Sequence, residues 1–221
     1  MISAAIFDVD GTLLDSLSMW EKIDELYLSR HGIQVSKEIS QTLFTYSLEE
    51  GARYMKEQFG IADPIDKMMQ DLIDLSMDFY EHQVPVKKGV VKVLDYLQDR
   101  HVPMAIATSN SHEVVTDVLL AHHLDHYFKK AFTVDEIGIG KESPDIYLKA
   151  CDYLKSRPQN TLVFEDAYHA IKTVKDAGFI TVGCYDAFSD QDQKLIKKKV
   201  DYYVHDMDEI LPSLKEASIH G

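Results

Sequence analysis

The chain opens with an apolar segment that ends in two aspartates. Residues 2–7 are almost all apolar, and Asp8, Asp10 and Gly11 follow. Side chains alternate between the two faces of a strand, so Asp8 and Asp10 are expected on the same side. An Asp-Gly turn after a strand is common, but that interpretation explains Asp10 and leaves Asp8 unexplained. We therefore predict a buried strand over residues 2–7 whose carboxyl end carries a pair of carboxylates.

The next seventy or so residues follow helical spacing, with no strand pattern among them. Helix start and stop signals divide this segment. They predict four helices: one from Ser16 to Gly32, one from Ser36 through Phe44, one from Ser47 to Phe59, and one with Pro64 as its first residue that runs through Phe79.

Beyond residue 85, short apolar runs alternate with helical patterns. The expected strands are 102–107, 131–134, 161–164, 180–184 and 200–204, and the expected helices are 89–97, 114–120, 144–154, 167–177 and 207–214. Such alternation is typical of βαβ units, which form a parallel sheet. We predict an α/β fold with a Rossmann-like parallel-sheet core, formed by residues 1–15 and 86–221, and an α-helical insertion at residues 16–85.

Composition narrows the function classes. The formal net charge is −14, from 23 basic and 37 acidic residues, which argues against a nucleic-acid-binding face. No apolar run reaches the roughly 18 residues of a membrane span. Two cysteines make no disulfide framework, and the first strand leaves no room for a signal peptide. We expect a cytoplasmic monomer that binds neither nucleic acid nor membrane.

Polar residues collect where the predicted strands end, and in a parallel sheet those ends lie at one edge. They are Asp8, Asp10, Thr108, Ser109, Asn110, Glu165 and Asp166, with Lys141 in a loop before a helix. Clustered carboxylates repel one another unless a cation such as Mg²⁺ lies between them. A cation, a lysine and hydroxyls together can neutralise and hold a phosphoryl group, and a carboxylate can attack it. The inventory indicates phosphoryl transfer.

This order of motifs resembles that of the haloacid dehalogenase superfamily. The matching segments are Asp8-Val9-Asp10-Gly11-Thr12, Thr108, Lys141 with Pro144-Asp145, and Glu165-Asp166. The helical insertion is similar to that superfamily's C1-type cap domain, and the likeness is closest to the phosphatase and β-phosphoglucomutase branch.

The resemblance implies roles for the motif residues. Asp8 would attack phosphorus and become an aspartyl-phosphate, while Asp10 would protonate the leaving oxygen and then activate water. Thr108 and Lys141 would bind the phosphoryl group, helped by Ser109 and Asn110. Mg²⁺ would bind Asp8, the backbone carbonyl of Asp10, and Asp166, with Glu165 as a further ligand or an anchor behind the ligands.

Three positions depart from the pattern of the superfamily. Glu142 follows Lys141 where many relatives have proline, and we expect its side chain to point to solvent. Ala167 and Ala170 stand where relatives often have serine and glycine. Ala167 cannot supply a hydroxyl, although Asp166 could still cap the helix that follows.

The insertion bears on the choice between phosphatase and mutase. β-Phosphoglucomutases place a histidine and a basic residue with glycine at positions that correspond here to Trp20, Phe44 and Thr45. A mutase must bind a second phosphate. Phe44 and Thr45 lie in a loop that also contains Tyr46, and this loop has no cationic side chain. Trp20, Phe44 and Tyr46 are candidates for substrate selection, and packing within the insertion is the alternative.

We therefore predict a Mg²⁺-dependent phosphatase that acts on a small phosphorylated metabolite such as a sugar phosphate. Two alternatives stay open at this stage. One is a sugar phosphomutase of the β-phosphoglucomutase type, and the other is a non-catalytic protein that binds a phosphorylated ligand.

Overall fold

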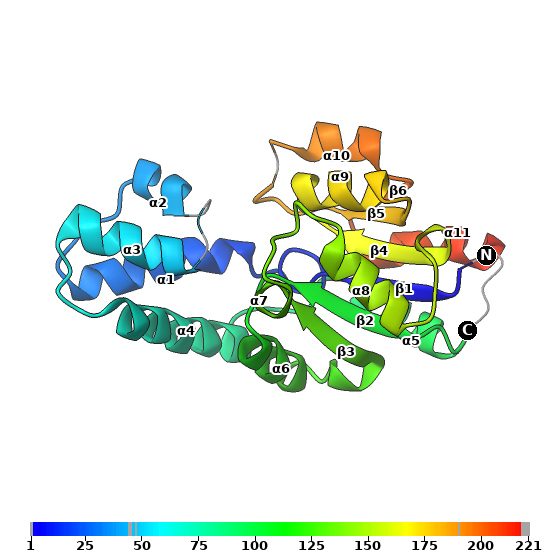
Figure 1. Cartoon of the computed structure of the whole chain (residues 1–221), viewed down its shortest axis with the longest axis horizontal. Coiled ribbons are helices and arrows are strands. Elements are labelled where there is room, and N and C mark those ends of the chain that lie inside the picture. The colour runs from blue at the N-terminus through cyan, green and yellow to red at the C-terminus, as the bar shows by residue number, and fades with distance from the viewer. Residues whose placement is uncertain (1, 44–45, 47, 190, 218–221) are drawn as a thin grey trace. The chain divides into compact units, whose positions relative to one another are not determined.

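The computed structural model describes residues 2–43, 46, 48–189 and 191–217. The chain divides into two compact units, one made of residues 1–15 and 85–221 and the other of residues 16–84. Figure 1 shows the strands in the first unit and helices alone in the second.

The first unit is built on a parallel sheet of six strands in the order β3-β2-β1-β4-β5-β6. The strands are β1 (Ala4–Phe7), β2 (Met104–Thr108), β3 (Phe128–Thr133), β4 (Thr161–Glu165), β5 (Ile180–Cys184) and β6 (Tyr202–Val204). This architecture confirms the predicted α/β class. β2 and β4 each run one residue further than expected, so Thr108 and Glu165 are the last residues of their strands.

The register of the central strands brings their carboxyl ends level. β1, β2 and β4 are buried along their whole length, as apolar strands covered on both faces should be. Phe7 pairs with Ile106 on one side and Phe164 on the other. The rings of Phe7 and Phe164 stack with their centroids 4.3 Å apart. The residues that follow Phe7, Ile106 and Phe164 therefore meet at one edge of the sheet.

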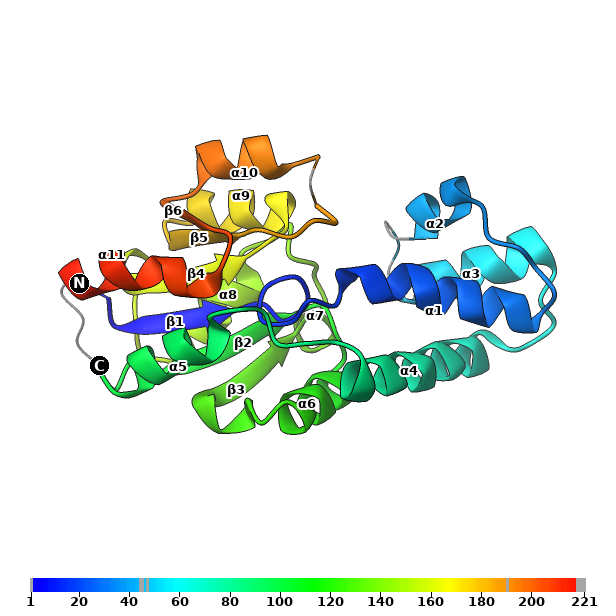
Figure 2. The same cartoon turned by 180° about the vertical axis from the view of Figure 1, so that it is seen from behind.

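Helices cover both faces of this sheet. They are α5 (Val90–Gln98), α6 (His112–Ala121), α7 (Val134–Ile137), α8 (Asp145–Tyr153), α9 (Tyr168–Asp176), α10 (Gln193–Lys199) and α11 (Leu211–Glu216), with 3₁₀ turns at Asp125–Tyr127, Pro158–Asn160 and Met207–Ile210. Figures 1 and 2 show α8 and α9 on one face and α5 and α11 on the other.

The core of this unit follows from these layers. Ile6, Ala105 and Val163 from the sheet lie in one buried cluster with Tyr147 of α8 and Val174 of α9. The short helices α7 and α10 were not predicted. α7 is a single turn in which the Thr133 hydroxyl accepts a hydrogen bond from the backbone N–H of Glu136, a local cap that offers little periodicity to detect.

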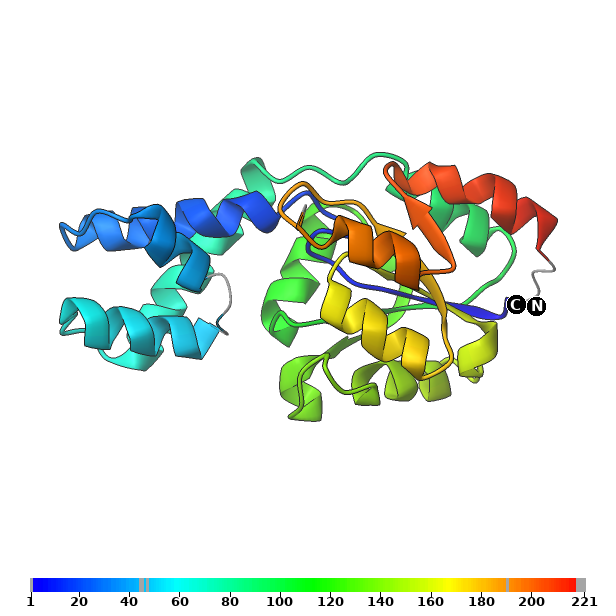
Figure 3. The same cartoon turned by 90° about the horizontal axis from the view of Figure 1, so that it is seen from above.

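The second unit consists of α1 (Leu17–Arg30), α2 (Lys37–Leu43), α3 (Leu48–Phe59) and α4 (Ile65–His82) (Figure 3). α4 contacts α1 and α3, and Met68 and Leu72 are buried on it at helical spacing. We predicted Pro64 as the first residue of this helix, and this was wrong. Pro64 precedes the helix as its N-cap, with ψ of 148°. Ser47, the predicted start of the third helix, lies outside the described residues.

The insertion begins and ends at neighbouring points of the first unit. The backbone N–H of Asp15 donates to the carbonyl of Pro85 at 3.0 Å, and Leu14 forms a bridge with Val86. Among the residues that the structure describes, no helix combines the length and apolar character needed to cross a membrane.

Candidate active site

Asp8 enters the site directly from β1. Its backbone N–H donates to the carbonyl of Phe164 at 3.1 Å, which continues the ladder to β4. The chain then turns tightly, with the backbone N–H groups of Leu13 and Leu14 both donating to the carbonyl of Val9. Gly11 has φ of +77°, a left-handed conformation that residues with a Cβ adopt at a cost. This turn places two carboxylates at the sheet edge.

Lys141 joins two of the acidic side chains. Its ammonium donates to the Asp8 carboxylate and, at 2.7 Å, to Oε1 of Glu165. Lys141 is only 6% exposed and Glu165 only 1%. Oε1 of Glu165 also accepts a hydrogen bond from the buried Tyr147 hydroxyl at 2.7 Å. Tyr147 and Glu165 thus hold Lys141 against Asp8.

The site carries more negative than positive charge. Burial raises the pKa of Asp8 to about 7, even though Lys141 lowers it. Burial, then Glu165 and Asp8, raise the pKa of Asp166 well above its ordinary range. Burial lowers the pKa of Lys141, but the two carboxylates outweigh this and leave it above its usual value. One lysine therefore faces three buried carboxylates.

These carboxylates fit a hard divalent cation. Oxygens of Asp8, Glu165 and Asp166 all lie within 4.8 Å of one another. Carboxylate oxygens are the ligands that Mg²⁺ prefers, and a cation would compensate the excess buried charge. The Thr12 hydroxyl donates to Oδ1 of Asp166 at 3.4 Å, which links the first turn to the end of β4. Glu165 also accepts hydrogen bonds from Lys141 and Tyr147, and its role as a ligand or as an anchor stays a prediction.

Asp10 is oriented by Asn110. The Asn110 side-chain amide donates to Oδ2 of Asp10 at 2.5 Å, and its backbone N–H donates to the buried Thr108 hydroxyl at 3.1 Å. We expected Asn110 to help bind phosphate; that role stays a prediction, and the structure shows in addition that its side-chain amide bonds to Asp10. Ser109 is exposed, whereas Asp10 is half-buried. Asp10 is thus held beside Asp8 with its side chain still accessible.

The three departures from the superfamily pattern have different consequences. The Glu142 side chain is exposed, as expected, and its backbone carbonyl accepts from the Thr173 hydroxyl at 3.1 Å. Asp166 does not cap α9: the N-cap is Ala167, with no side-chain hydrogen bond. Thr12 and the other carboxylates lie beside Asp166 instead. Ala170 is fully buried in the core cluster, where a small side chain packs.

The candidates for substrate selection lie in the helical unit. Trp20 is half-buried on α1. Tyr46 is 41% exposed, and its ring centroid lies 5.6 Å from that of Tyr54. Phe44 and Thr45 lie outside the described residues. These contacts agree with packing inside the helical unit, and the role of Trp20, Phe44 and Tyr46 in selection stays a prediction.

Comparison with known proteins places the chain in a family. Residues 5–184 match the model of the haloacid dehalogenase-like hydrolases. The chain belongs to this family. The resemblance expected from the four motifs is therefore confirmed, and with it the expectation of an enzyme.

Several relatives of the chain within this family carry phosphatase names. A phosphorylated carbohydrates phosphatase of Thermotoga maritima is 23% identical over 177 residues, which are 80% of this chain and 82% of that protein. The (DL)-glycerol-3-phosphatase 2 of Arabidopsis thaliana is 28% identical over 197 residues, 82% of this chain and 78% of that protein. A β-phosphoglucomutase structure from Clostridium difficile shares the fold, with a TM-score of 0.77, 18% identity, and coverage of 98% of this chain and 96% of that one.

Four side chains around the motifs of this hydrolase were not singled out from sequence. Thr12 contacts Asp166, Tyr147 contacts Glu165, and Lys87 forms a partly buried pair with Asp186. Thr12 stands inside the first motif, so its position was a usable signal. Lys87 and Asp186 stand 99 residues apart and follow no pattern that would connect them.

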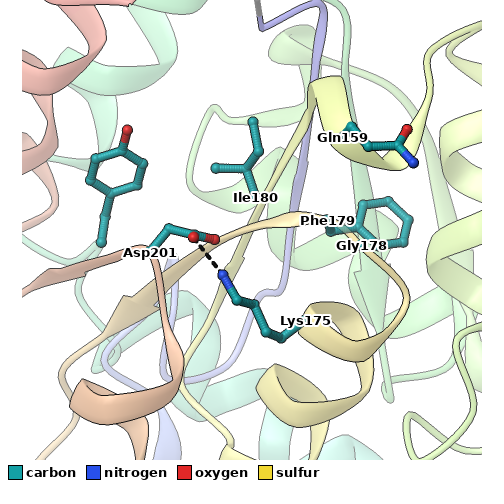
Figure 4. Close-up of a pocket in the computed structure, with 7 residues that line it drawn as sticks. Gln159, Lys175, Gly178, Phe179, Ile180 and Asp201 are labelled. Atoms are coloured by element: carbon teal, nitrogen blue, oxygen red, sulfur yellow. Dashed lines mark hydrogen bonds and ion pairs between the residues drawn. The ribbon is translucent and has the colours of Figure 1, made fainter.

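A hollow of about 440 Å³ lies elsewhere on this hydrolase (Figure 4). It is lined by Gln159, Lys175, Gly178, Phe179, Ile180, Asp201 and Tyr202. Ile180 and Tyr202 are the first residues of β5 and β6, so the hollow lies at the amino ends of these strands. Figure 4 shows Lys175 and Asp201 paired within it. Because the motif residues lie at the carboxyl ends, this hollow is not the candidate active site.

Proposed function

We propose that the chain is a Mg²⁺-dependent phosphatase that hydrolyses a small phosphate monoester, with Asp8 as the nucleophile. One observation carries the proposal: a buried Asp8–Lys141–Glu165 array stands beside an accessible second aspartate, Asp10. A carboxylate next to a lysine can accept a phosphoryl group while the lysine neutralises its oxygens.

The first step transfers the phosphoryl group to the protein. An oxygen of the Asp8 carboxylate bonds to phosphorus as the bond from phosphorus to the ester oxygen breaks. Asp10, oriented by Asn110, gives its proton to that departing oxygen, so that a neutral alcohol leaves. Lys141 stabilises the negative charge of the phosphoryl oxygens, while Glu165 and Tyr147 hold its ammonium in place.

The second step returns the free enzyme. A water molecule attacks the phosphorus of the Asp8 phosphate and gives a proton to Asp10, and inorganic phosphate leaves as the Asp8 carboxylate re-forms. The carboxylates of Asp8 and Asp166, with Glu165 behind them, would hold Mg²⁺. When bound, the ion would supply positive charge to the phosphoryl oxygens.

The names of two relatives support the substrate class that we propose. Two of them are named for phosphorylated carbohydrates and for glycerol 3-phosphate, both small polyhydroxylated monoesters. We extend this class to the present chain, and we assign substrate selection to a helical cap domain formed by residues 16–84. Trp20 and Tyr46 are the described candidates there.

Phosphate release by the purified full chain tests this function. With Mg²⁺, p-nitrophenyl phosphate and a panel of sugar and polyol phosphates should be hydrolysed. The Asp8→Asn variant should lose turnover by about a thousandfold or more. Unchanged turnover in that variant would refute the mechanism. Conversion of β-glucose 1-phosphate to the 6-phosphate faster than phosphate release would replace the phosphatase with a mutase.

A further inference from the structure

Lys87 is a partly buried lysine in the segment that returns from the helical insertion to the sheet. Its side chain is 16% exposed. The ammonium donates to the carbonyl of Gly11 at 2.6 Å, to the carbonyl of Tyr185 at 2.7 Å and to Oδ2 of Asp186 at 2.8 Å. An ammonium has three N–H donors, so all three of its hydrogen bonds are made.

The acceptors of Lys87 belong to two turns at the carboxyl edge of the sheet. Gly11 is the residue directly after Asp10, and Tyr185 and Asp186 directly follow β5. The backbone N–H of Lys87 also donates to the carbonyl of Leu13 at 2.8 Å. Lys87 is therefore bonded to the turn after Asp8 at two points, once through its side chain and once through its backbone.

Asp186 is a fixed partner for this ammonium. It is 4% exposed, and its Oδ1 accepts the backbone N–H of Phe188 at 2.8 Å. Its backbone carbonyl accepts from the side-chain amide of Gln193 at 3.3 Å, and Gln193 in turn accepts from the Tyr203 hydroxyl at 2.6 Å. The carboxylate thus has little freedom to follow a displaced lysine.

We infer that Lys87, with Asp186 as its counter-ion, is a positioning residue that fixes the turn carrying Asp8 and Asp10. The inference rests on the proposed phosphatase function. Gly11 allows the left-handed turn but does not by itself select it, because glycine populates many conformations. A charged donor on the Gly11 carbonyl selects one of them. Misplacement of reacting groups by about 1 Å can cost about a hundredfold in rate.

The test compares Lys87→Met with Lys92→Met. Lys92 pairs with Asp208 at 2.7 Å on the neighbouring helix turn, but its side chain is 69% exposed, so it is a matched control. We expect Lys87→Met to lower kcat on p-nitrophenyl phosphate by about 10- to 100-fold, with KM changed by less than about threefold. Lys92→Met should match the wild type. A kcat within about twofold of the wild type in Lys87→Met would overturn the inference.

A double variant separates positioning from stability. Lys87→Met leaves Asp186 buried without its cation, which destabilises the fold. Lys87→Met with Asp186→Asn removes that unpaired charge, so the melting temperature should recover at least in part. The bond to Gly11 is still missing, so kcat should stay low. Recovery of kcat together with the melting temperature would show a merely structural role and overturn the inference.

Amide hydrogen exchange gives a reading that needs no turnover. In Lys87→Met, the amides of residues 9–14 should exchange faster, whereas those of β4 should keep the rate of the Lys92→Met control. Equal exchange in the two variants would overturn the inference. If the wild type hydrolyses no phosphate ester, the proposed function fails, while this exchange difference still decides the role of Lys87.

Discussion

At the scale of single residues, the site is defined by a charge imbalance. Lys141 is shared between Asp8 and Glu165, and Asp166 has no lysine contact among the hydrogen bonds described for it. Buried carboxylates in excess of cations favour either protonation or a bound metal. The Asp8 carboxylate shares one lysine with Glu165, so part of the negative charge of the cluster stays uncompensated.

Removal of Lys141 should affect both stability and activity. Lys141→Met would leave the buried Asp8 and Glu165 carboxylates without a cation, at a cost of about 3 kcal/mol in the free energy of unfolding. It should also lower kcat/KM by about a hundredfold or more. Urea unfolding and initial rates measure the two effects. Lys149→Met, an exposed position on α8, is the control, and equal values for the two variants would contradict the assignment.

Asp8 also predicts how stability depends on pH without metal. Its pKa is about 7 in the folded chain, against 3.8 for an ordinary aspartate, so the folded state holds a proton that the unfolded state has released. The stabilisation is complete below the unfolded pKa and is lost as the pH rises through about 7. In EDTA, the free energy of unfolding should fall between about pH 4 and about pH 7. The fall should be smaller in Asp8→Asn, and an equal fall would show that another group titrates.

Mg²⁺ should reverse this trend, because the ion and the proton compete for the same carboxylate oxygens. The affinity of the chain for Mg²⁺, measured by calorimetry, should therefore rise as the pH rises across the same range. Affinity that is independent of pH would place the ion away from Asp8 and Asp166.

At the scale of elements, Gly89 allows the start of α5 to pack closely against the 3₁₀ turn Met207–Ile210. Gly89 is the N-cap of α5 with φ of +84°, and a Cβ there would lie 2.3 Å from the backbone nitrogen of Asp208. Gly138 has φ of +77° with nothing within 4 Å. Both alanine variants pay the left-handed penalty of about 1 kcal/mol, but only Gly89→Ala meets backbone. Gly89→Ala should lower the melting temperature clearly more than Gly138→Ala, and equal shifts would contradict this packing.

The elements also show what sequence can reveal. The carboxyl ends of parallel strands lie at one edge of a sheet. The positions of Asp8, Thr108 and Glu165 at the ends of apolar strands were therefore enough to predict that they meet there. Lys141 was found because it precedes a helix in a loop between two predicted strands. Lys87 was not found from sequence, because two adjacent lysines, Lys87 and Lys88, are typical of a solvent-exposed turn. Only the folded chain brings it to Gly11, 76 residues away.

Contacts made by side chains were the harder part of the site to predict. Asn110 was assigned to phosphate because it follows Thr108, and that role stays a prediction. The hydrogen bond from its amide to Asp10, 100 residues away, was not predicted. Tyr147 was not singled out from sequence; its ring lies in the core, and its hydroxyl donates to Glu165. A strand end predicts which residues meet, whereas the pairing among them depends on side-chain rotamers and burial.

At the scale of the whole molecule, the insertion leaves and re-enters the first unit at one point. Asp15 is hydrogen-bonded to Pro85, and Leu14 bridges Val86. Replacing residues 16–84 by a short Gly-Ser linker should therefore leave a first unit that unfolds cooperatively. We expect this variant to lose discrimination among sugar phosphates relative to p-nitrophenyl phosphate. Circular dichroism and the substrate panel test both points, and an unfolded product would contradict the independence of the unit.

In the proposed mechanism, Asp8 carries the phosphoryl group. Asp10→Asn should slow hydrolysis of the intermediate, because the water would lack its base. We would mix this variant with p-nitrophenyl phosphate and Mg²⁺, quench in acid, digest with pepsin and map the peptides by mass. We expect one added phosphoryl group on the peptide that contains Asp8, and none when Asp8→Asn is introduced as well. A phosphoryl group on another peptide, or on none while turnover continues, would contradict this mechanism.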